Sequence, residues 1–369
     1  MNVLSLFDGM SCGQIAINRI GLKCDRYLAS EIDVYSMSVT KENYPDTEHI
    51  GSVVDIDTSL LPEIDLLIGG SPCQSFSFAG TRKGMATSCS VDILSLEQYL
   101  QLKREGFKFE GQSYLFWEYM RILKAVNPTY FLLENVRMSE KWQRVLSRAI
   151  GIDPIMIDSC LVSGQSRKRL FWTNIGTQCN NLFGIAEPGI GQPEDRGILL
   201  RDILQGEEDI ADKFYLKDAA LKYMSRERNG RVRYEYHKNE VDGKAGCLTA
   251  NMWKGVPYGV VRLDECKRSK AIQRSVSRDK STPIDASYYK GFGMRLGICR
   301  QVVAEEGRVR RLTPMECERL QTVPDNYTSG VSDSQRYKML GNGWTIDVIA
   351  YILGHMDKKR LNPVKTASN

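Results

Sequence analysis

The alternation of short apolar runs with helix-like segments in the first half of the chain is the feature that most constrains its fold. A strand buried on both faces is a continuous apolar run, whereas a helix repeats its apolar positions about every 3.6 residues. Helical stretches such as CGQIAINRIG (12–21) and YLFWEYMRILKAVNP (114–128) end at Gly21 and Pro128, two residues that stop helices. The strand-like runs are VLSLF (3–7), YLAS (27–30), IDLLIGG (64–70), TYFLLENV (129–136), IMIDSCLV (155–162) and LFWTNI (170–175). Their alternation with helices predicts an α/β fold, a parallel sheet with helices on both faces.

This alternation fades after about residue 180, where Gly, Arg and Tyr become frequent and short strand-like pieces such as RVRYEYH appear. Apolar helical patterns return in LTPMECERLQTVP and GNGWTIDVIAYILGHM. A chain of 369 residues fits two or three domains. We therefore expect a first α/β domain at 1–180, a smaller mixed, strand-rich domain at 181–310, and a C-terminal segment at 311–369 that returns to the first domain.

The net charge of +5 conceals an uneven distribution. Residues 217–311 hold 22 Lys and Arg against 11 Asp and Glu, which leaves 28 basic and 34 acidic residues in the rest of the chain. The stretch KRSKAIQRSVSRDK (267–280) carries six basic residues and one acid. Such a region favours a polyanionic partner, most simply nucleic acid. A solvated surface would carry the same charges, so charge alone leaves both interpretations open.

Membrane proteins and metal-dependent enzymes are disfavoured by the sequence. No run approaches the roughly 18 to 20 apolar residues that span a bilayer, and MNVLSLFDGM has no basic leader. We expect a cytoplasmic protein without membrane contact. The ten cysteines form no C-x-x-C pair and only three histidines occur, so we expect no metal site. Most of the thiols should be free and buried, as is usual in a reducing compartment.

The stretch LFDGMSCGQIA (6–16) joins the first predicted strand to the first predicted helix. Gly9 and Gly13 would permit a tight turn and a close approach of the backbone to a ligand. Glu31, at the end of the next strand, can accept hydrogen bonds from ribose hydroxyls. Asp8 would repel a pyrophosphate, so an adenosine without phosphates, such as S-adenosylmethionine, fits better. A glycine-rich turn without a ligand is the alternative.

A cysteine stands directly after a strand-like run in GGSPCQSFS (69–77). Pro72 restricts the backbone before Cys73 and removes a hydrogen-bond donor, which stiffens the loop. The thiol is either a small buried hydrophobic group or a nucleophile displayed on a rigid loop. Its neighbours in the fold decide between the two.

Polar residues follow two further strands. Glu134 and Asn135 end TYFLLENV, at the edge where open α/β sheets bind ligands. In QSRKR (165–169), Arg167 and Arg169 occupy alternate positions, which would place them on one face of a strand. A glutamate buried at that edge requires a partner.

These motifs occur together in one order, and with them the chain resembles the DNA (cytosine-5)-methyltransferases. The matching pieces are FDGMSCG (7–13), SEID (30–33), GGSPCQSFS (69–77), LLENV (132–136), QSRKR (165–169), RRLTPMECERLQTVP (310–324) and GNGWTID (341–347). They span nearly the whole chain except 181–310. The resemblance implies a Rossmann-like class I methyltransferase sheet and a smaller target-recognition domain at 181–310.

The resemblance also implies a mechanism. Cys73 would attack C6 of a cytosine, which makes C5 nucleophilic. Glu134 would hold N3 of the ring, Arg169 would contact O2, and Arg167 would support the site and its charge balance. Both arginines would favour the thiolate of Cys73. The methyl group would pass from S-adenosylmethionine to C5, giving 5-methylcytosine and S-adenosylhomocysteine. The implied catalytic set is Cys73, Glu134, Arg167, Arg169, Pro72 and Asn135.

Cofactor contacts carry over less evenly. The implied set is Phe7, Gly9, Ser11, Cys12, Gly13, Glu31, Ile32, Ser52, Val53, Asn342 and Trp344. The family element that usually reads Gly-Asp before an apolar residue reads Gly51-Ser52-Val53 here. Ser52 can accept a hydrogen bond from the adenine amino group but carries no charge, and Asp55, three residues on, is the candidate substitute for the family's acid.

The target base cannot react inside a stacked duplex, so the resemblance implies base flipping. We expect the loop after Cys73, with its insertion to about residue 112, to close over DNA and to be mobile without it. The target-recognition domain would contact phosphates with its basic residues and base edges with a few polar ones.

Double-stranded DNA is the expected partner of a monomeric protein, with a cognate restriction endonuclease, an orphan role or a phage origin left open. A tRNA (cytosine-5)-methyltransferase is one alternative. Such relatives usually carry Cys-Phe-Thr in the smaller domain, and this chain has CLT at 247–249. A catalytically silent relative is the other, although such proteins tend to lose the motifs that are present here.

Overall fold

The computed structural model describes residues 1–72, 86–87, 92–178, 187–215, 227–228, 231–232, 302–305 and 308–361. The chain divides into two compact units. The first contains 1–157, 168–192 and 349–369, and the second contains 158–167 and 193–348. Most of the target-recognition domain expected at 181–310 lies outside the described residues, and its boundaries stay a prediction. No described helix is both long and apolar enough to cross a bilayer.

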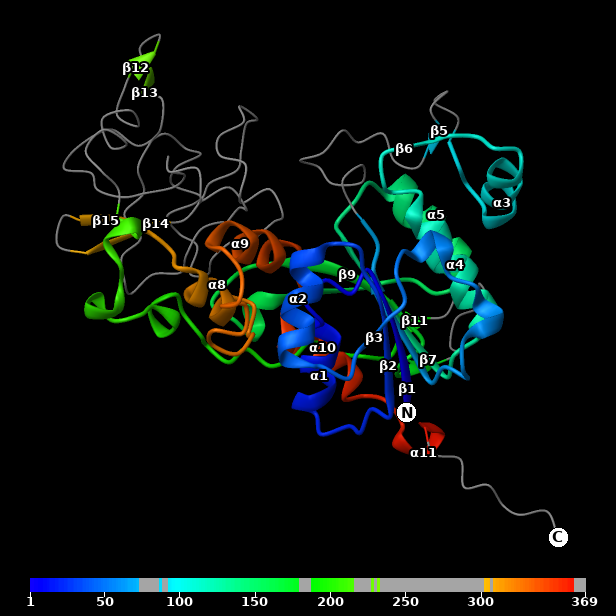
Figure 1. Ribbon diagram of the computed structural model, residues 1–369, viewed down its shortest axis with the longest axis horizontal. Helices are drawn as coiled ribbons and strands as arrows, with labels where there is room; N and C mark the ends of the chain where they lie inside the picture. The colour runs from blue at the N-terminus through cyan, green and yellow to red at the C-terminus, as the bar shows by residue number, and fades with distance from the viewer. Residues whose placement is uncertain are drawn as a thin grey trace. The chain divides into compact units, whose positions relative to one another are not determined.

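A seven-stranded sheet forms the centre of the first unit, in the order β3-β2-β1-β4-β7-β9-β8 (Figure 1). Its strands are β1 Asn2–Leu6, β2 Arg26–Ser30, β3 Glu48–His49, β4 Leu66–Gly70, β7 Tyr130–Val136, β8 Ile155–Asp158 and β9 Lys168–Thr173. Strand β1 pairs in parallel with β2 and β4, and the pairs β2–β3 and β4–β7 are also parallel. The predicted Rossmann-like α/β fold is confirmed.

The direction of β9 differs from the expected all-parallel sheet, because β9 runs antiparallel to β7. Only residues 159–167, which include the short 3₁₀ helix η3 (Ser159–Leu161), join β8 to β9. A parallel connection needs a crossover of about a dozen residues or more, usually a helix. The apolar run at 170–175 carries no information about this direction, and the short connection decides it.

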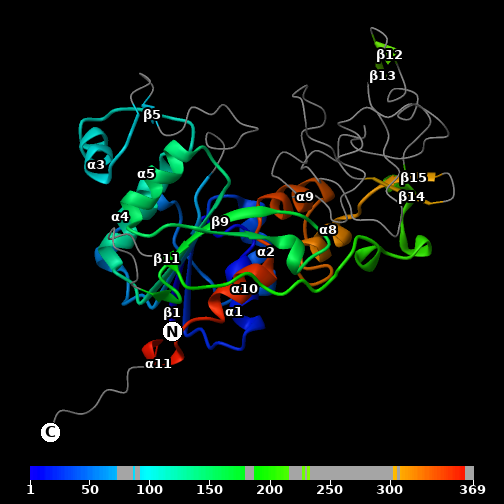
Figure 2. The ribbon, with the colours of Figure 1, turned by 180° about the vertical axis from the view of Figure 1, so that it is seen from behind.

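Helices lie on both faces of the sheet, with α4 (Leu115–Val126) and α5 (Glu140–Ile150) on one side and α1 (Cys12–Arg19) and α2 (Val34–Asn43) on the other (Figures 1 and 2). Helix α1 ends near Gly21, which has a φ of 65°. Helix α4 ends at Val126, followed by Asn127 in the left-handed region. Both ends agree with the stop signals in the sequence. Helix α10 (Ile346–Leu353) and the short α11 (Lys358–Leu361) follow near the C-terminus.

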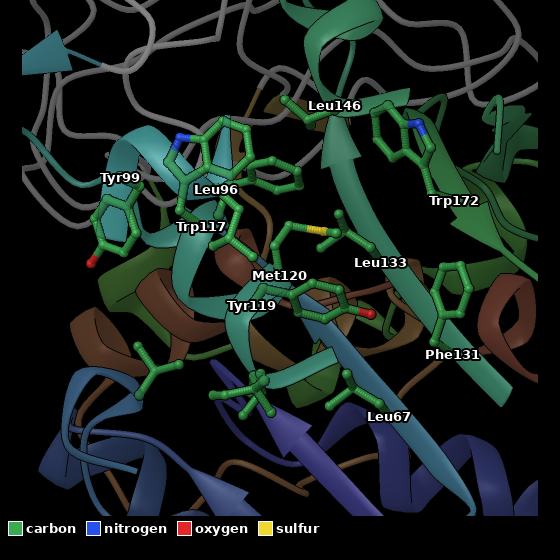
Figure 3. Packing of buried hydrophobic residues seen from close by; sticks show 14 of the residues in the cluster. Leu67, Leu96, Tyr99, Trp117, Tyr119, Met120, Phe131, Leu133, Leu146 and Trp172 are labelled. Atoms are coloured by element: carbon green, nitrogen blue, oxygen red, sulfur yellow. The ribbon is translucent and has the colours of Figure 1, made fainter. Parts of the chain in front are cut away.

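Helix α4 supplies much of the apolar core of the first unit. Trp117, Tyr119 and Met120 are at most 1% exposed and pack with Leu67 of β4 and Leu133 of β7 (Figure 3). Burial of each large apolar side chain stabilises the fold by roughly 1.5–3 kcal/mol. The core therefore secures the two strands whose ends carry the predicted cysteine loop and the predicted glutamate.

The segment between the cysteine loop and α4 contains β5 (Ala86–Thr87), α3 (Leu96–Arg104) and β6 (Phe109–Glu110). Ile93, Leu96 and Tyr99 belong to the buried core cluster, so residues 92–110 are packed on the body of the first unit. The mobility and the closure over DNA expected for the insertion to residue 112 stay predictions. Residues 73–85 and 88–91 lie outside the described residues.

The second unit is described in smaller pieces. Its longest elements are β14 (Val302–Glu305), β15 (Arg308–Arg311), α8 (Pro314–Leu320) and α9 (Asp333–Asn342). Thr313 and Glu316 form a capping box at the start of α8, and Glu316 also pairs with the buried Arg310. The remaining short elements in the two units are η1 Val53–Asp55, η2 Thr58–Leu60, η4 Arg201–Ile203, η5 Glu207–Asp209, η6 Asp212–Phe214, β10 Thr177–Gln178, β11 Glu187–Pro188, β12 Glu227–Arg228 and β13 Arg231–Val232.

Candidate active site and cofactor turn

The carboxyl ends of four parallel strands bring the predicted site residues of the first unit to one edge of the sheet. Leu6 of β1 pairs with Ser30 of β2 and with Gly69 of β4, and Gly70 pairs with Glu134 of β7. The residues that follow these positions are Phe7, Glu31, Ser71 and Asn135. The edge is the one where open α/β sheets bind ligands.

The turn after β1 is built from left-handed residues. Phe7, Gly9 and Ser11 have φ values of 58°, 60° and 59°. A left-handed conformation costs a non-glycine residue roughly 1–2 kcal/mol, so Phe7 and Ser11 must be held in place. The N–H of Gly9 donates to Oε2 of Glu31 at 2.8 Å, which ties the turn to the end of β2.

Glu31 organises the start of α2 as well. Its Oε1 accepts the backbone N–H groups of Ile32 at 2.7 Å and Asp33 at 2.8 Å. A carboxylate offers about four acceptor positions, so these three bonds leave capacity for a ligand hydroxyl. Beside it, the side chain of Ile32 is 69% exposed and offers an apolar surface.

The carboxylate of Asp8 points into the protein, whereas the sequence analysis considered this acid only for its repulsion of a pyrophosphate. Its carboxylate accepts a hydrogen bond from the Tyr27 hydroxyl at 2.8 Å and another from the Ser11 hydroxyl. Burial raises the pKa of Asp8 to about 6, against the opposing effect of these hydrogen bonds. Asp8 therefore holds Ser11 in the left-handed conformation from beneath the turn.

Gly13 and Cys12 lie in the first turn of α1 and are buried. A Cβ atom at Gly13 would lie 2.2 Å from Cδ1 of Ile68 and 2.6 Å from the Tyr27 hydroxyl. The close approach that requires this glycine is thus the packing of α1 on β4 and β2. The sequence analysis had explained Gly13 by close approach to a ligand, but side chains of the protein fill the space beside it.

The third predicted cofactor element is the 3₁₀ turn η1, preceded by Ser52. Ser30 donates its hydroxyl to the carbonyl of Gly51 at 2.8 Å, which places this element beside the end of β2. Val53 is 5% exposed, and the Ser52 hydroxyl makes no capping hydrogen bond. Asp55 is exposed, and its role as a substitute for the family's acid stays a prediction.

Glu134 and Arg169 form the polar pair at the end of β7. Nε of Arg169 lies 2.9 Å from Oε1 of Glu134, and the two side chains are 14% and 11% exposed. Among the described residues the Nε–H makes no hydrogen bond, so its contact with Glu134 is an ion pair. The antiparallel direction of β9 creates it, because Val136 opposite Arg169 makes Glu134 its diagonal neighbour.

Asn135 secures the entrance to the cysteine loop. Its Nδ2 donates to the hydroxyl of Ser71 at 3.0 Å and to the carbonyl of Ser71 at 3.3 Å. Pro72 follows Ser71 and is half-buried. Cys73 lies outside the described residues, so the structure describes the loop only up to its proline.

Arg167 has a different position from the one its spacing suggested. Strand β9 begins at Lys168, one residue after it. Within the second unit, Nη2 of Arg167 donates to the carbonyls of Gly341 at 3.2 Å and Gly343 at 2.9 Å. Arg167 thus supports the turn that carries Asn342, so the prediction that it shares a strand face with Arg169 is wrong.

Two buried glutamines that the sequence assigned no role complete this support in the second unit. Nε2 of Gln321 donates to the carbonyls of Leu340 and Gly343, at 2.7 and 3.2 Å. Oε1 of Gln321 accepts from Gln165 at 2.7 Å and from Thr345 at 2.8 Å. The backbone around Asn342 and Trp344 is therefore held on both sides. The sequence marked these glutamines only by their places in two of the family motifs, QSRKR (165–169) and RRLTPMECERLQTVP (310–324).

A groove of about 520 Å³ in the first unit is lined by Val54, Asp55, Ile56, Asp57, Leu100, Lys103, Arg104 and Arg121. None of the predicted site residues lines it, except that Asp55 had been considered as a substitute. The described residues show no group of three or more His, Cys, Asp or Glu side chains that could hold a metal ion.

The sequence profile described as C-5 cytosine-specific DNA methylase matches residues 1–96, 100–146 and 162–358. The orphan methyltransferase M.SPRI of Bacillus phage SPR is 25% identical, and the alignment covers 98% of each chain. The type II methyltransferase M.HpaII of Haemophilus parainfluenzae is 24% identical over 94% of this chain and 86% of the relative.

Solved structures with low identity share the fold. The methyltransferase EhMeth of Entamoeba histolytica is 14% identical, with a TM-score of 0.59 and coverage of 98% of each chain. A mutant of DNMT2 from Spodoptera frugiperda is 17% identical, with a TM-score of 0.55 and coverage of 96% of this chain and 98% of that one. With the profile match extending over most of the sequence, the chain belongs to the C-5 cytosine-specific DNA methylase family.

Proposed function

We propose that this chain is a site-specific DNA cytosine-5 methyltransferase that uses S-adenosylmethionine. The observation that carries the proposal is the buried Glu134–Arg169 pair, one strand away from Ser71, which leads into Pro72 and Cys73. This arrangement brings a carboxyl group and a guanidinium to the same edge as the cofactor turn. The carboxyl group could hydrogen-bond N3 of a cytosine ring, and the guanidinium could hydrogen-bond O2.

The described residues fit S-adenosylmethionine. The left-handed turn at Phe7–Ser11 has no side chain at Gly9, and a Cβ there would meet no atom within 4 Å, so space is open beside it. Glu31 retains acceptor capacity for a ribose hydroxyl, and the exposed Ile32 would cover one face of an adenine. When bound, this cofactor supplies an electrophilic methyl group on a sulfonium.

The chain's own residues would activate the cytosine. Sγ of Cys73 adds to C6, and the carboxyl group of Glu134 at N3 balances the charge that this addition places on the ring. Arg169 contacts O2 while its pairing with Glu134 keeps both groups in place. With the cofactor bound, C5 would take its methyl group and S-adenosylhomocysteine would remain. Transfer of the C5 proton to a solvent water would then expel the Cys73 thiolate from C6 and release 5-methylcytosine.

Access to the base requires that it leave the duplex. Asn135 would set the direction of the cysteine loop toward the flipped base through its bonds to Ser71. In the second unit, Arg167 and Gln321 would hold the turn with Asn342 and Trp344, which the family pattern assigns to the cofactor.

Double-stranded DNA is the proposed substrate, acted on by a monomer in the cytoplasm of a bacterium or in a phage-infected cell. The relatives named above are described as orphan and type II methyltransferases, so either an orphan enzyme or the companion of a restriction endonuclease is compatible with the proposal. Methylation of tRNA, or a silent relative without activity, are the alternatives that the experiment must separate.

A base-resolution map of 5-methylcytosine tests the proposal. The chain and its Cys73→Ser variant are expressed in a bacterial host that lacks cytosine methylation. Methylation at one short recurring sequence, absent with the variant, is the expected result. An empty map from soluble protein would contradict DNA methylation, and transfer of labelled methyl groups to tRNA would then establish the alternative substrate.

A further inference from the structure

Arg121 of α4 reaches from the helix to the backbone of the turn that contains Ser52 and Val53. Its Nη2 donates to the carbonyl of Val53 and its Nη1 donates to the carbonyl of Ile56, both at 3.2 Å. These carbonyls belong to η1 and to its C-cap, Ile56. A planar guanidinium can bond two acceptors at a fixed separation, which a lysine ammonium cannot.

The guanidinium is itself held by a buried carboxylate. Oε2 of Glu118 accepts from Nε of Arg121 at 2.7 Å, and the Glu118 side chain is fully buried. Oε1 of Glu118 accepts from Tyr99 and from Lys103 of α3, both at 2.5 Å. Three donors therefore satisfy one buried acid, and the geometry of Arg121 is set on both sides.

We infer that Arg121 is a positioning residue for the cofactor, acting through the backbone of residues 52–56. The inference rests on the proposed function, since it concerns the turn proposed to contact adenine. The family's acid at position 52 is a serine here, so the side chain at this position contributes less electrostatic attraction. The orientation of the Ser52 hydroxyl and of the Val53 backbone then depends on how rigidly Arg121 holds the carbonyls that follow.

Substitution of Arg121 separates this role from folding. Arg121 is 21% exposed and lines the groove, so a smaller side chain leaves no sealed cavity. Arg121→Lys retains the charge beside Glu118 but cannot bond both carbonyls. Lys124→Gln is the matched control, because Lys124 lies on the same helix, is exposed, and pairs with the exposed Glu97 at 3.7 Å.

The readouts are the dissociation constant for S-adenosylmethionine, measured without nucleic acid, and KM and kcat for methyl transfer. We expect Arg121→Lys to retain the melting temperature of the parent within a few degrees. We expect the same variant to raise both the dissociation constant and the KM for S-adenosylmethionine about 10-fold, as expected for loss of a charged hydrogen bond. The value of kcat at saturating cofactor should change less than about 2-fold. Lys124→Gln should match the parent in all readouts.

Hydrogen exchange of the amides in 52–56 supplies a readout that needs no cofactor. We expect faster exchange in Arg121→Lys and in Arg121→Gln than in Lys124→Gln. A folded Arg121→Lys protein with unchanged exchange and unchanged cofactor binding would overturn the inference. Failure of the proposed DNA substrate would instead leave cofactor binding intact and abolish only methyl transfer to DNA, so the two failures differ.

Discussion

Arg169 and Glu134 approach each other across two neighbouring antiparallel strands, with Nε and Oε1 2.9 Å apart and both side chains largely shielded from water. The loss of one member of such a pair leaves the other charge without its partner, which costs about 3 kcal/mol when the pair is buried. Because the pair is proposed to contact the cytosine ring, its loss should affect both stability and catalysis.

Glu134→Gln retains the shape of the side chain but cannot supply a negative charge or a carboxyl proton. We expect kcat for DNA methylation to fall about 100-fold or more, the range of a lost acid–base group. The dissociation constant for S-adenosylmethionine should stay within a factor of about 2. Steady-state kinetics with labelled cofactor measures this, with the exposed Glu140→Gln of α5 as control. A variant with the kcat of the parent would remove Glu134 from the mechanism.

Asn135→Ala removes both hydrogen bonds to Ser71. We expect a loss of about 1–3 kcal/mol in the free energy of unfolding, because a buried carbonyl and a buried hydroxyl lose their donor. We also expect a lower kcat with unchanged cofactor affinity, since Ser71 leads into the loop of the proposed nucleophile, Cys73. Denaturant titration and single-turnover kinetics check the two effects. An Asn135→Asp variant, which accepts but cannot donate to the Ser71 carbonyl, should resemble the alanine variant in kcat.

The titration of Asp8 makes the free energy of unfolding depend on pH. Its pKa of about 6, raised by burial above the ordinary value of 3.8, means that the folded state binds the proton more tightly than the unfolded state. This contribution to stability is fully present below about pH 4, is lost as the pH rises to about 6, and is constant above that, a change of about 3 kcal/mol.

Asp8→Asn should abolish this change. The free energy of unfolding of the variant, relative to that of the parent, is expected to rise by roughly that amount between pH 4 and pH 6. Denaturant titrations of both proteins across this range measure the difference, in which the other titrating groups cancel. A difference that does not vary with pH would show that Asp8 titrates normally.

Gly13→Ala would place a methyl group 2.2 Å from Cδ1 of Ile68. We expect destabilisation by about 1–3 kcal/mol, as for other overpacked cores. Ile68→Val removes Cδ1, the atom with which the new methyl group would clash. The double variant Gly13→Ala/Ile68→Val should therefore recover part of the lost stability. Melting temperatures of the parent, the two single variants and the double variant form a double-mutant cycle, which measures the coupling between the two positions. Additive losses would show that Ile68 is not what makes the glycine necessary.

Local patterns were enough to predict six of the seven strands of the central sheet, all but β3, and the helices α1 and α4. The apolar run TYFLLENV became β7 over Tyr130–Val136, and the signals at Gly21 and Pro128 marked two helix ends within two residues. These predictions succeeded because burial on both faces and helix termination depend on residues that are neighbours in the chain. The motif residues at strand ends met at one edge because parallel strands end together.

Contacts between distant parts of the chain could not be predicted in the same way. Arg167 and Arg169 looked equivalent in QSRKR, yet one bonds the carbonyls of Gly341 and Gly343 and the other pairs with Glu134. The insertion at 92–110 looked like a polar segment, but three apolar side chains within it are buried in the core. In each case the partner lies far away in the sequence or on another element.

The sequence by itself determined the α/β class, the edge of the sheet where the candidate site residues lie, and the resemblance that the profile match confirmed as family membership. Only the tertiary structure decided the antiparallel direction of β9, the inward carboxyl of Asp8 and the bonds from Arg121 to the turn at Val53. The physical reason is the distance along the chain over which each kind of interaction acts. Apolar periodicity and turn chemistry act over a few residues, whereas a buried charge is stabilised by whichever donor the packed elements bring within about 3 Å.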